Sequence, residues 1–153
     1  MSLRATLLVA TVLVALMAAY TLRDALRWPR SGGLSPTLSA QVGGSLRRYA
    51  LLIGLVEGGA LVALVVALFR VPPGSPNMWW VGLAILCVGL MIGVWGLWLR
   101  PLELMMATWT PDTQPADHTH HHARRSRLHG IRAILAILAL ALLLIGVAAS
   151  TVN

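Results

Sequence analysis

The chain of 153 residues has no lysine, one cysteine and only 11% charged residues. A soluble domain of this length usually carries about a quarter charged residues. The single cysteine, Cys87, excludes a disulfide within the chain and any thiol–disulfide chemistry that needs a cysteine pair. We interpret Cys87 as a small buried apolar side chain, because it lies inside an apolar run.

The sequence contains long apolar runs, and 58% of its residues are hydrophobic. Roughly 20 apolar residues are needed to cross a hydrocarbon layer about 30 Å thick. Four runs meet this requirement and use most of the chain: residues 3–22, 49–69, 78–99 and 131–152. The sequence therefore predicts an all-α, up-down bundle of four transmembrane helices, a single integral membrane domain over residues 1–153.

The first run has the outline of a secretory signal. It lacks a clear small-residue cleavage site, however, and arginines follow it directly at 23, 27 and 30. We therefore expect it to be retained as a membrane span.

The distribution of the twelve arginines predicts the orientation of the bundle. Ten of them lie in the predicted loops 23–48 and 100–130 or, as Arg132, at the start of the fourth run, whereas the opposite side has only Arg4 and Arg70. Arginine-rich loops stay on the cytoplasmic side of a membrane. We expect both loops to be cytoplasmic and both termini to be outside, in a multi-pass protein of the cytoplasmic (inner) membrane. Arginines beside apolar spans indicate the lipid bilayer, not nucleic acid, as the partner.

Glu57 is the ionisable residue that lies deepest within the four runs, eight residues into the second one. An ionised carboxylate at that depth costs several kcal/mol unless it is paired or hydrated. Three arrangements are open. Glu57 can be protonated and hydrogen-bonded as a structural lock, it can pair with an arginine such as Arg132, or it can line a wet pocket that handles protons or a ligand.

The approach to the fourth run carries a polar stripe. Its members recur at intervals of three and four, so on one continuous helix they share a face: His118, His122, Arg125, His129 and Arg132. His129 and Arg132 stand at the membrane entrance. Together with Glu57 they form the candidate catalytic site.

A second candidate site is the histidine tract His118, His120, His121 and His122. Imidazole is a ligand for zinc, copper and iron, so the tract resembles a metal-binding segment. The alternative is a solvated histidine-rich loop that binds metal only adventitiously, since no cysteine or carboxylate completes a tetrahedral ligand set.

Glycines spaced four apart give two predicted packing faces, Gly54 with Gly58 and Gly89 with Gly93. Small residues at this spacing let membrane helices approach closely.

The second half of the chain contains Arg100-Pro101-Leu102-Glu103, then Trp109, Pro115-Ala116-Asp117, the arginines of 124–127, and Leu128-His129-Gly130-Ile131-Arg132. This pattern resembles the anthrone-oxygenase-like family of small four-helix bacterial membrane proteins, whose last span is entered through a His-x-x-Arg stretch. His129 and Arg132 match that stretch, whereas Glu103 stands where the family tends to have asparagine. The resemblance implies a four-helix fold and oxygenation of a polycyclic aromatic substrate without an obvious cofactor.

Three functions are consistent with these features. The first is an oxidoreductase for a lipophilic aromatic substrate, in which Glu57 accepts a proton and His129 and Arg132 bind a developing oxyanion. The second is a non-enzymatic accessory subunit of a larger membrane complex, or a homo-oligomer, joined through the glycine faces. The third is binding or transport of zinc, copper or iron through the histidine tract.

Overall fold

A computed structural model describes residues 3–27, 36–109 and 117–149; for residues 27, 36–51 and 118 it describes the backbone alone. The regular secondary structure of the described residues is entirely helical: α1 (Leu3–Arg27), α2 (Pro36–Arg70), α3 (Pro76–Val94), a π-helical turn η2 (Trp95–Leu99), α4 (Arg100–Met106) and α5 (His118–Ala149). Four segments are long and apolar enough to cross a membrane, namely Leu3–Leu26, Leu52–Arg70, Pro76–Met106 and Thr119–Ala149. The prediction of an all-helical, multi-pass membrane protein is confirmed to the extent that four helices have the length and the composition of membrane spans.

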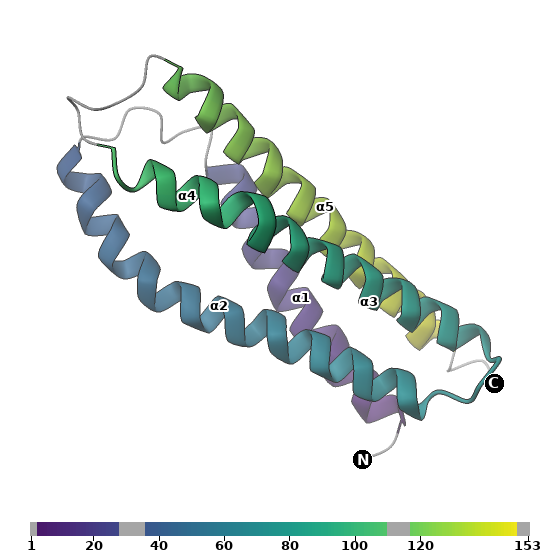
Figure 1. Cartoon of the computed structure of the whole chain (residues 1–153). Coiled ribbons are helices and arrows are strands. Elements are labelled where there is room, and N and C mark those ends of the chain that lie inside the picture. Colours follow the sequence, from purple (N-terminus) through teal and green to yellow (C-terminus); the bar gives the residue numbers. More distant parts are fainter. Residues whose placement is uncertain (1–2, 28–35, 110–116, 150–153) are drawn as a thin grey trace.

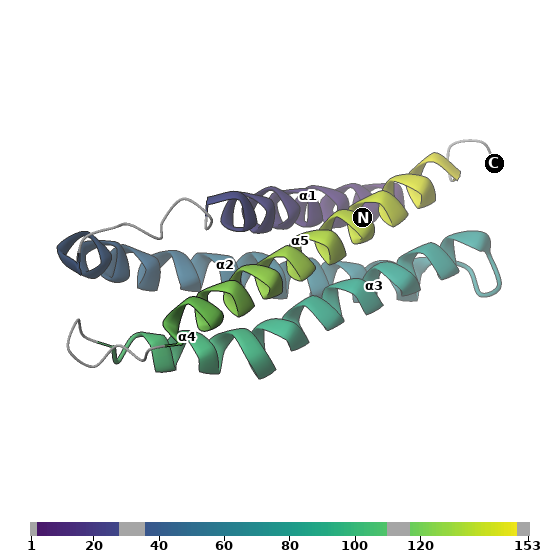
Figure 2. The ribbon, with the colours of Figure 1, turned by 90° about the horizontal axis from the view of Figure 1, so that it is seen from above.

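The helices are arranged as an up-down bundle in which neighbours in the ring are α1 with α2, α2 with α3, α3 with α5, and α5 with α1. The start of α1, the end of α5 and the turn between α2 and α3 lie at one end, and the start of α5 and the end of α4 lie at the other (Figure 1). Figure 2 shows α5 crossing the bundle obliquely between α1 and α3. Gly74 in the α2–α3 turn has a φ of 79°, a backbone conformation that favours glycine.

Three helices extend beyond the spans expected from hydropathy. Helix α1 continues to Arg27, α2 begins at Pro36, and α5 begins at His118, so the predicted loops 23–48 and 100–130 are partly helical. An α-helix rises 1.5 Å per residue, so the 32 residues of α5 span about 48 Å, well beyond the hydrocarbon layer. Hydropathy marks only the lipid-embedded part of each helix, and the polar ends continue the same backbone hydrogen-bonding pattern.

The half of the bundle next to the α2–α3 turn has a core of apolar side chains, many of them small. The buried set includes Ala10, Val14, Ala60, Leu64, Ala67, Val81, Ala84, Val88, Ala136, Ala139 and Leu143. Because burial of apolar surface does not drive helices together in lipid, close approach of small side chains provides the packing. On α5, Gly146 faces Trp80 of α3, and a Cβ at this glycine would lie 3.4 Å from the Trp80 Cβ.

The predicted glycine packing faces do not hold this bundle together. A Cβ added at Gly54, Gly58, Gly89 or Gly93 would meet no atom within 4 Å among its surroundings. Alanines occupy the inward positions instead, so these glycines lie on outward faces of α2 and α3.

The π turn changes which side chains of the third span face inward. Along α3 the buried residues are Val81, Ala84, Val88 and Met91, a spacing that would continue to 95, 98, 102 and 105. In η2 the Arg100 N–H bonds to the Trp95 carbonyl, five residues back. Leu99 is buried and Trp98 and Met105 are exposed, although Leu102 is buried as the regular spacing would have it. The π turn contains one residue more than an α-helical turn, and this accommodates Pro101. The proline has no N–H to donate, and its ring would clash with the preceding turn of a regular α-helix.

Candidate functional site

One face of α5 carries a series of polar side chains whose burial increases toward the middle of the bundle. Arg125 has 17% of its side chain exposed, and over the whole residue His129 is 6% and Arg132 2% exposed. His122 at the outer end is half-buried. The predicted stripe therefore points into the bundle; the side chain of His118 lies outside the described residues.

Arg132 forms an ion pair with Glu57, in which the Arg132 Nη2 donates to the Glu57 Oε1. Glu57 is 6% exposed, so both partners are buried. Helices α2 and α5 are not neighbours in the ring, and the long side chains of this pair cross the bundle from one helix to the other. Of the three arrangements expected for Glu57, the structure has the pairing with Arg132.

A second cluster of polar side chains lies nearer the end of the bundle where α5 begins, and it surrounds Glu103 of α4. The Glu103 Oε1 accepts hydrogen bonds from Arg125 Nη2 at 2.7 Å and Nε at 3.1 Å. The Nε2 of His129 lies 3.6 Å from the same oxygen. His129, which the sequence placed in one candidate site with Glu57 and Arg132, thus lies next to Glu103 of α4.

These two clusters form one continuous feature, because α5 places Arg125, His129 and Arg132 on successive turns. We call the five residues Glu57, Glu103, Arg125, His129 and Arg132 the polar ladder. The π turn contributes directly to it. The one-residue offset after η2 leaves Glu103 half-buried beside α5 while its neighbour Leu104 is exposed.

Helix α1 adds a tyrosine–aspartate pair beside the deeper end of the polar ladder. Tyr20 and Asp24 lie one turn apart on α1, close enough for their side chains to interact. Tyr20 also lies within electrostatic range of both Arg132 and Glu57. Three helices, α1, α2 and α5, thus contribute polar groups to this region.

The Arg132 guanidinium retains an unused donor. Its Nε is buried and has no hydrogen-bond partner among the described residues. A buried donor without a partner costs about 1–3 kcal/mol, more when it is charged. Arg132 Nε could therefore donate to an oxygen of a bound molecule beside Glu57.

The three histidines of the tract whose side chains are described, His120, His121 and His122, have different surroundings. His121 Nε2 lies 3.3 Å from Asp117 Oδ2, and the rings of His121 and His122 both pack edge-on against Trp109. The His120 ring is exposed and lies 6.1 Å from that of His121, measured between centroids. Within the described residues no three His, Cys, Asp or Glu side chains are grouped to hold a metal ion. Metal binding by the tract stays a prediction, since it includes the His118 side chain.

Sequence reasoning missed Glu103 as the partner of Arg125 and His129, and missed Tyr20 with Asp24. Two signals were present. Asp24 follows Tyr20 by four residues, the spacing that brings side chains together on a helix. Pro101 inside a helical run indicated an irregular turn, although its effect on the direction of Glu103 needed the structure.

Comparison of the chain with protein-family models, with curated proteins and with solved structures gives no match. The resemblance to anthrone-oxygenase-like proteins stays a prediction.

The ion pair between Glu57 and Arg132 can be tested through the free energy of unfolding. Arg132→Leu should lower the free energy of unfolding by about 3 kcal/mol or more, because it leaves Glu57 buried without its partner. The double variant Glu57→Leu/Arg132→Leu should recover most of this loss, since apolar replacement of a buried pair is often close to neutral. Thermal or denaturant unfolding in detergent micelles measures both. A double variant no more stable than Arg132→Leu would show that the pair is not the source of the effect.

Proposed function

We propose that this protein is a membrane oxidoreductase that acts on a lipophilic aromatic substrate at the deeper end of the polar ladder. The observation that carries the proposal is a buried carboxylate–guanidinium pair whose arginine keeps an unused donor. Charged groups inside a membrane protein are expensive and usually mark sites that handle protons, ions or substrates. Apolar side chains could fill the same volume without that cost, so stability alone does not account for the pair.

The chemistry that suits these groups is removal of a proton next to a carbonyl, as in an anthrone. Glu57 accepts the proton from the ring CH₂ carbon, and the negative charge moves to the carbonyl oxygen. The Arg132 Nε stabilises that oxyanion, while His129 lies one turn away along α5. The carbanion is then oxidised by dioxygen, so that CH₂ and O₂ become a second carbonyl and one water molecule.

Replacement of the proposed base tests this function. Glu57→Gln keeps a hydrogen-bonding group beside Arg132 but removes the proton acceptor, so turnover of an anthrone should fall about 100-fold or more. Oxygen uptake and quinone absorbance of the purified protein in lipid nanodiscs measure it. Arg127→Gln, a charge change on an exposed part of α5, should leave turnover unchanged. If Glu57→Gln and His129→Ala both keep full turnover, the proposed roles are wrong.

A second candidate function, an accessory subunit of a larger membrane complex, is favoured by the outward glycines. Gly82, Gly89, Gly93 and Gly96 follow one side of the third span, and a Cβ at any of them would meet open space. Glycines at four- and seven-residue spacing let a second helix approach closely. A helix of another protein, or of a second copy, fits this face.

Replacing glycines of this face by larger side chains tests the accessory role. Gly89→Leu/Gly93→Leu should leave the isolated protein folded but abolish co-purification of a partner in mild detergent. Ala141→Leu is the matched control, because Ala141 is exposed on α5, away from the glycines. A wild-type protein that purifies as a lone monomer, or a glycine variant that keeps its partner, would contradict the role.

The arginine distribution supports an orientation with the arginine-rich end in the cytoplasm and both termini outside. Arg100, Arg124, Arg125 and Arg127 are at the end where α4 finishes and α5 begins, whereas Arg70 lies beside the α2–α3 turn.

Cysteine labelling tests the orientation. In a Cys87→Ala background, Pro73→Cys in the exposed α2–α3 turn should react with a membrane-impermeant maleimide added to intact cells. Thr119→Cys, exposed at the start of α5, should react only after the cells are permeabilised. Labelling of Thr119→Cys in intact cells, with protection of Pro73→Cys, would show the opposite orientation.

A further inference from the structure

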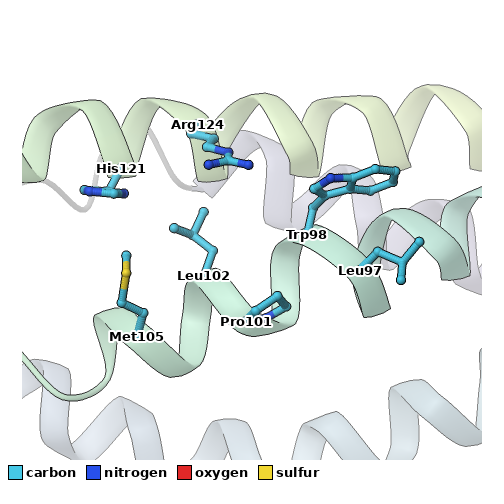
Figure 3. Close-up of a pocket in the computed structure, with 7 residues that line it drawn as sticks. All are labelled: Leu97, Trp98, Pro101, Leu102, Met105, His121 and Arg124. Atoms are coloured by element: carbon cyan, nitrogen blue, oxygen red, sulfur yellow. The ribbon is translucent and has the colours of Figure 1, made fainter.

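A hollow of about 230 Å³ lies on the outer surface of the bundle, between the π turn with α4 on one side and the start of α5 on the other (Figure 3). Leu97, Trp98, Pro101 and Met105 come from the third span, and His121 and Arg124 come from α5. None of these residues belongs to the polar ladder. The hollow is therefore separate from the proposed catalytic region.

The two walls of the hollow differ in chemistry. The wall from η2 and α4 is apolar, and Leu97, Trp98 and Met105 are exposed large side chains. The wall from α5 is basic, because Arg124 and His121 lie three residues apart on the same face of the helix. A ligand that fits both walls has an anionic group next to a hydrocarbon part.

Arg124 is available for such a ligand. It is exposed and forms no ion pair with any described residue, whereas Arg125 beside it is engaged with Glu103. His121 holds Asp117 through Nε2, and its buried Nδ1 has no partner within the described part of the chain.

The hollow lies at the level where a lipid headgroup would meet the protein. Trp95 and Trp98 lie at this end of the third span, and tryptophan prefers the boundary between hydrocarbon and headgroups. The Arg100 guanidinium stacks 5.6 Å above the Trp95 ring, which adds a further positive charge at this level. A basic hollow between membrane helices at headgroup depth is typical of sites for anionic lipids.

We propose that the hollow binds one anionic phospholipid, with its phosphate on Arg124 and His121 and the start of an acyl chain along Leu97, Trp98 and Met105. The irregular backbone of η2 and Pro101 creates the site, because the offset turns Trp98 outward instead of into the bundle. A zwitterionic lipid carries a cationic headgroup next to Arg124 and is disfavoured. The occupant is thus a phosphatidylglycerol-like lipid of the surrounding bilayer.

Native mass spectrometry of the full-length protein released from nanodiscs of equal parts phosphatidylglycerol and phosphatidylcholine tests the proposal. The wild type should retain one phosphatidylglycerol in preference to phosphatidylcholine. Arg124→Gln should lower the retained phosphatidylglycerol about fivefold, the effect of one arginine near a lipid surface. Arg127→Gln removes the same charge three residues further along α5, at an exposed position that does not line the hollow, and should retain the lipid as the wild type does.

Several outcomes would overturn the site. Equal loss in Arg124→Gln and Arg127→Gln would show a general charge effect of the arginine-rich end. Retention by Arg124→Gln at the wild-type level, or equal retention of both lipids by the wild type, would exclude the site as well. Displacement of the lipid by millimolar inorganic phosphate would indicate a phosphate site without a role for the acyl chain. Circular dichroism of each variant in the same nanodiscs confirms that the helices are intact.

Discussion

The ion pair between Glu57 and Arg132 is the constraint on which the middle of this bundle depends. Both charges are buried where water cannot solvate them, so each is tolerated only because the other is present. The pair also joins helices that are not neighbours in the ring, α2 and α5. The contact therefore links the height and rotation of α2 to those of α5 across the bundle.

Helix α5 combines two environments on one face. From His122 to Arg132 its inward positions are polar, and from Ala136 to Leu143 they are small or apolar. Along the described part of α5, the inward polar positions therefore end at Arg132, where it pairs with Glu57.

The four spans and the inward stripe on α5 could be read from the sequence, because apolar length and three-four spacing are local properties. The partner of each charge could not. His129 and Arg132 stand three residues apart, yet one contacts Glu103 and the other Glu57. That division depends on the heights of Glu57 on α2 and of Glu103 on α4 relative to α5, which no local pattern encodes. The prediction that the glycine faces pack within the bundle was wrong for a related reason. Their spacing shows that another helix can approach closely, but it does not show which helix does so.

The π turn at Trp95–Leu99 has a consequence for how this chain should be compared with others. It behaves as a single inserted residue, and one residue of an α-helix corresponds to about 100° around its axis. A sequence alignment that treats the third span as a regular helix would match Glu103 to a position that points in a direction about 100° away around the helix axis. The true counterpart in a helix without the turn stands one place earlier along the chain. Deleting one residue of the turn would thus alter the ladder more than many substitutions within it.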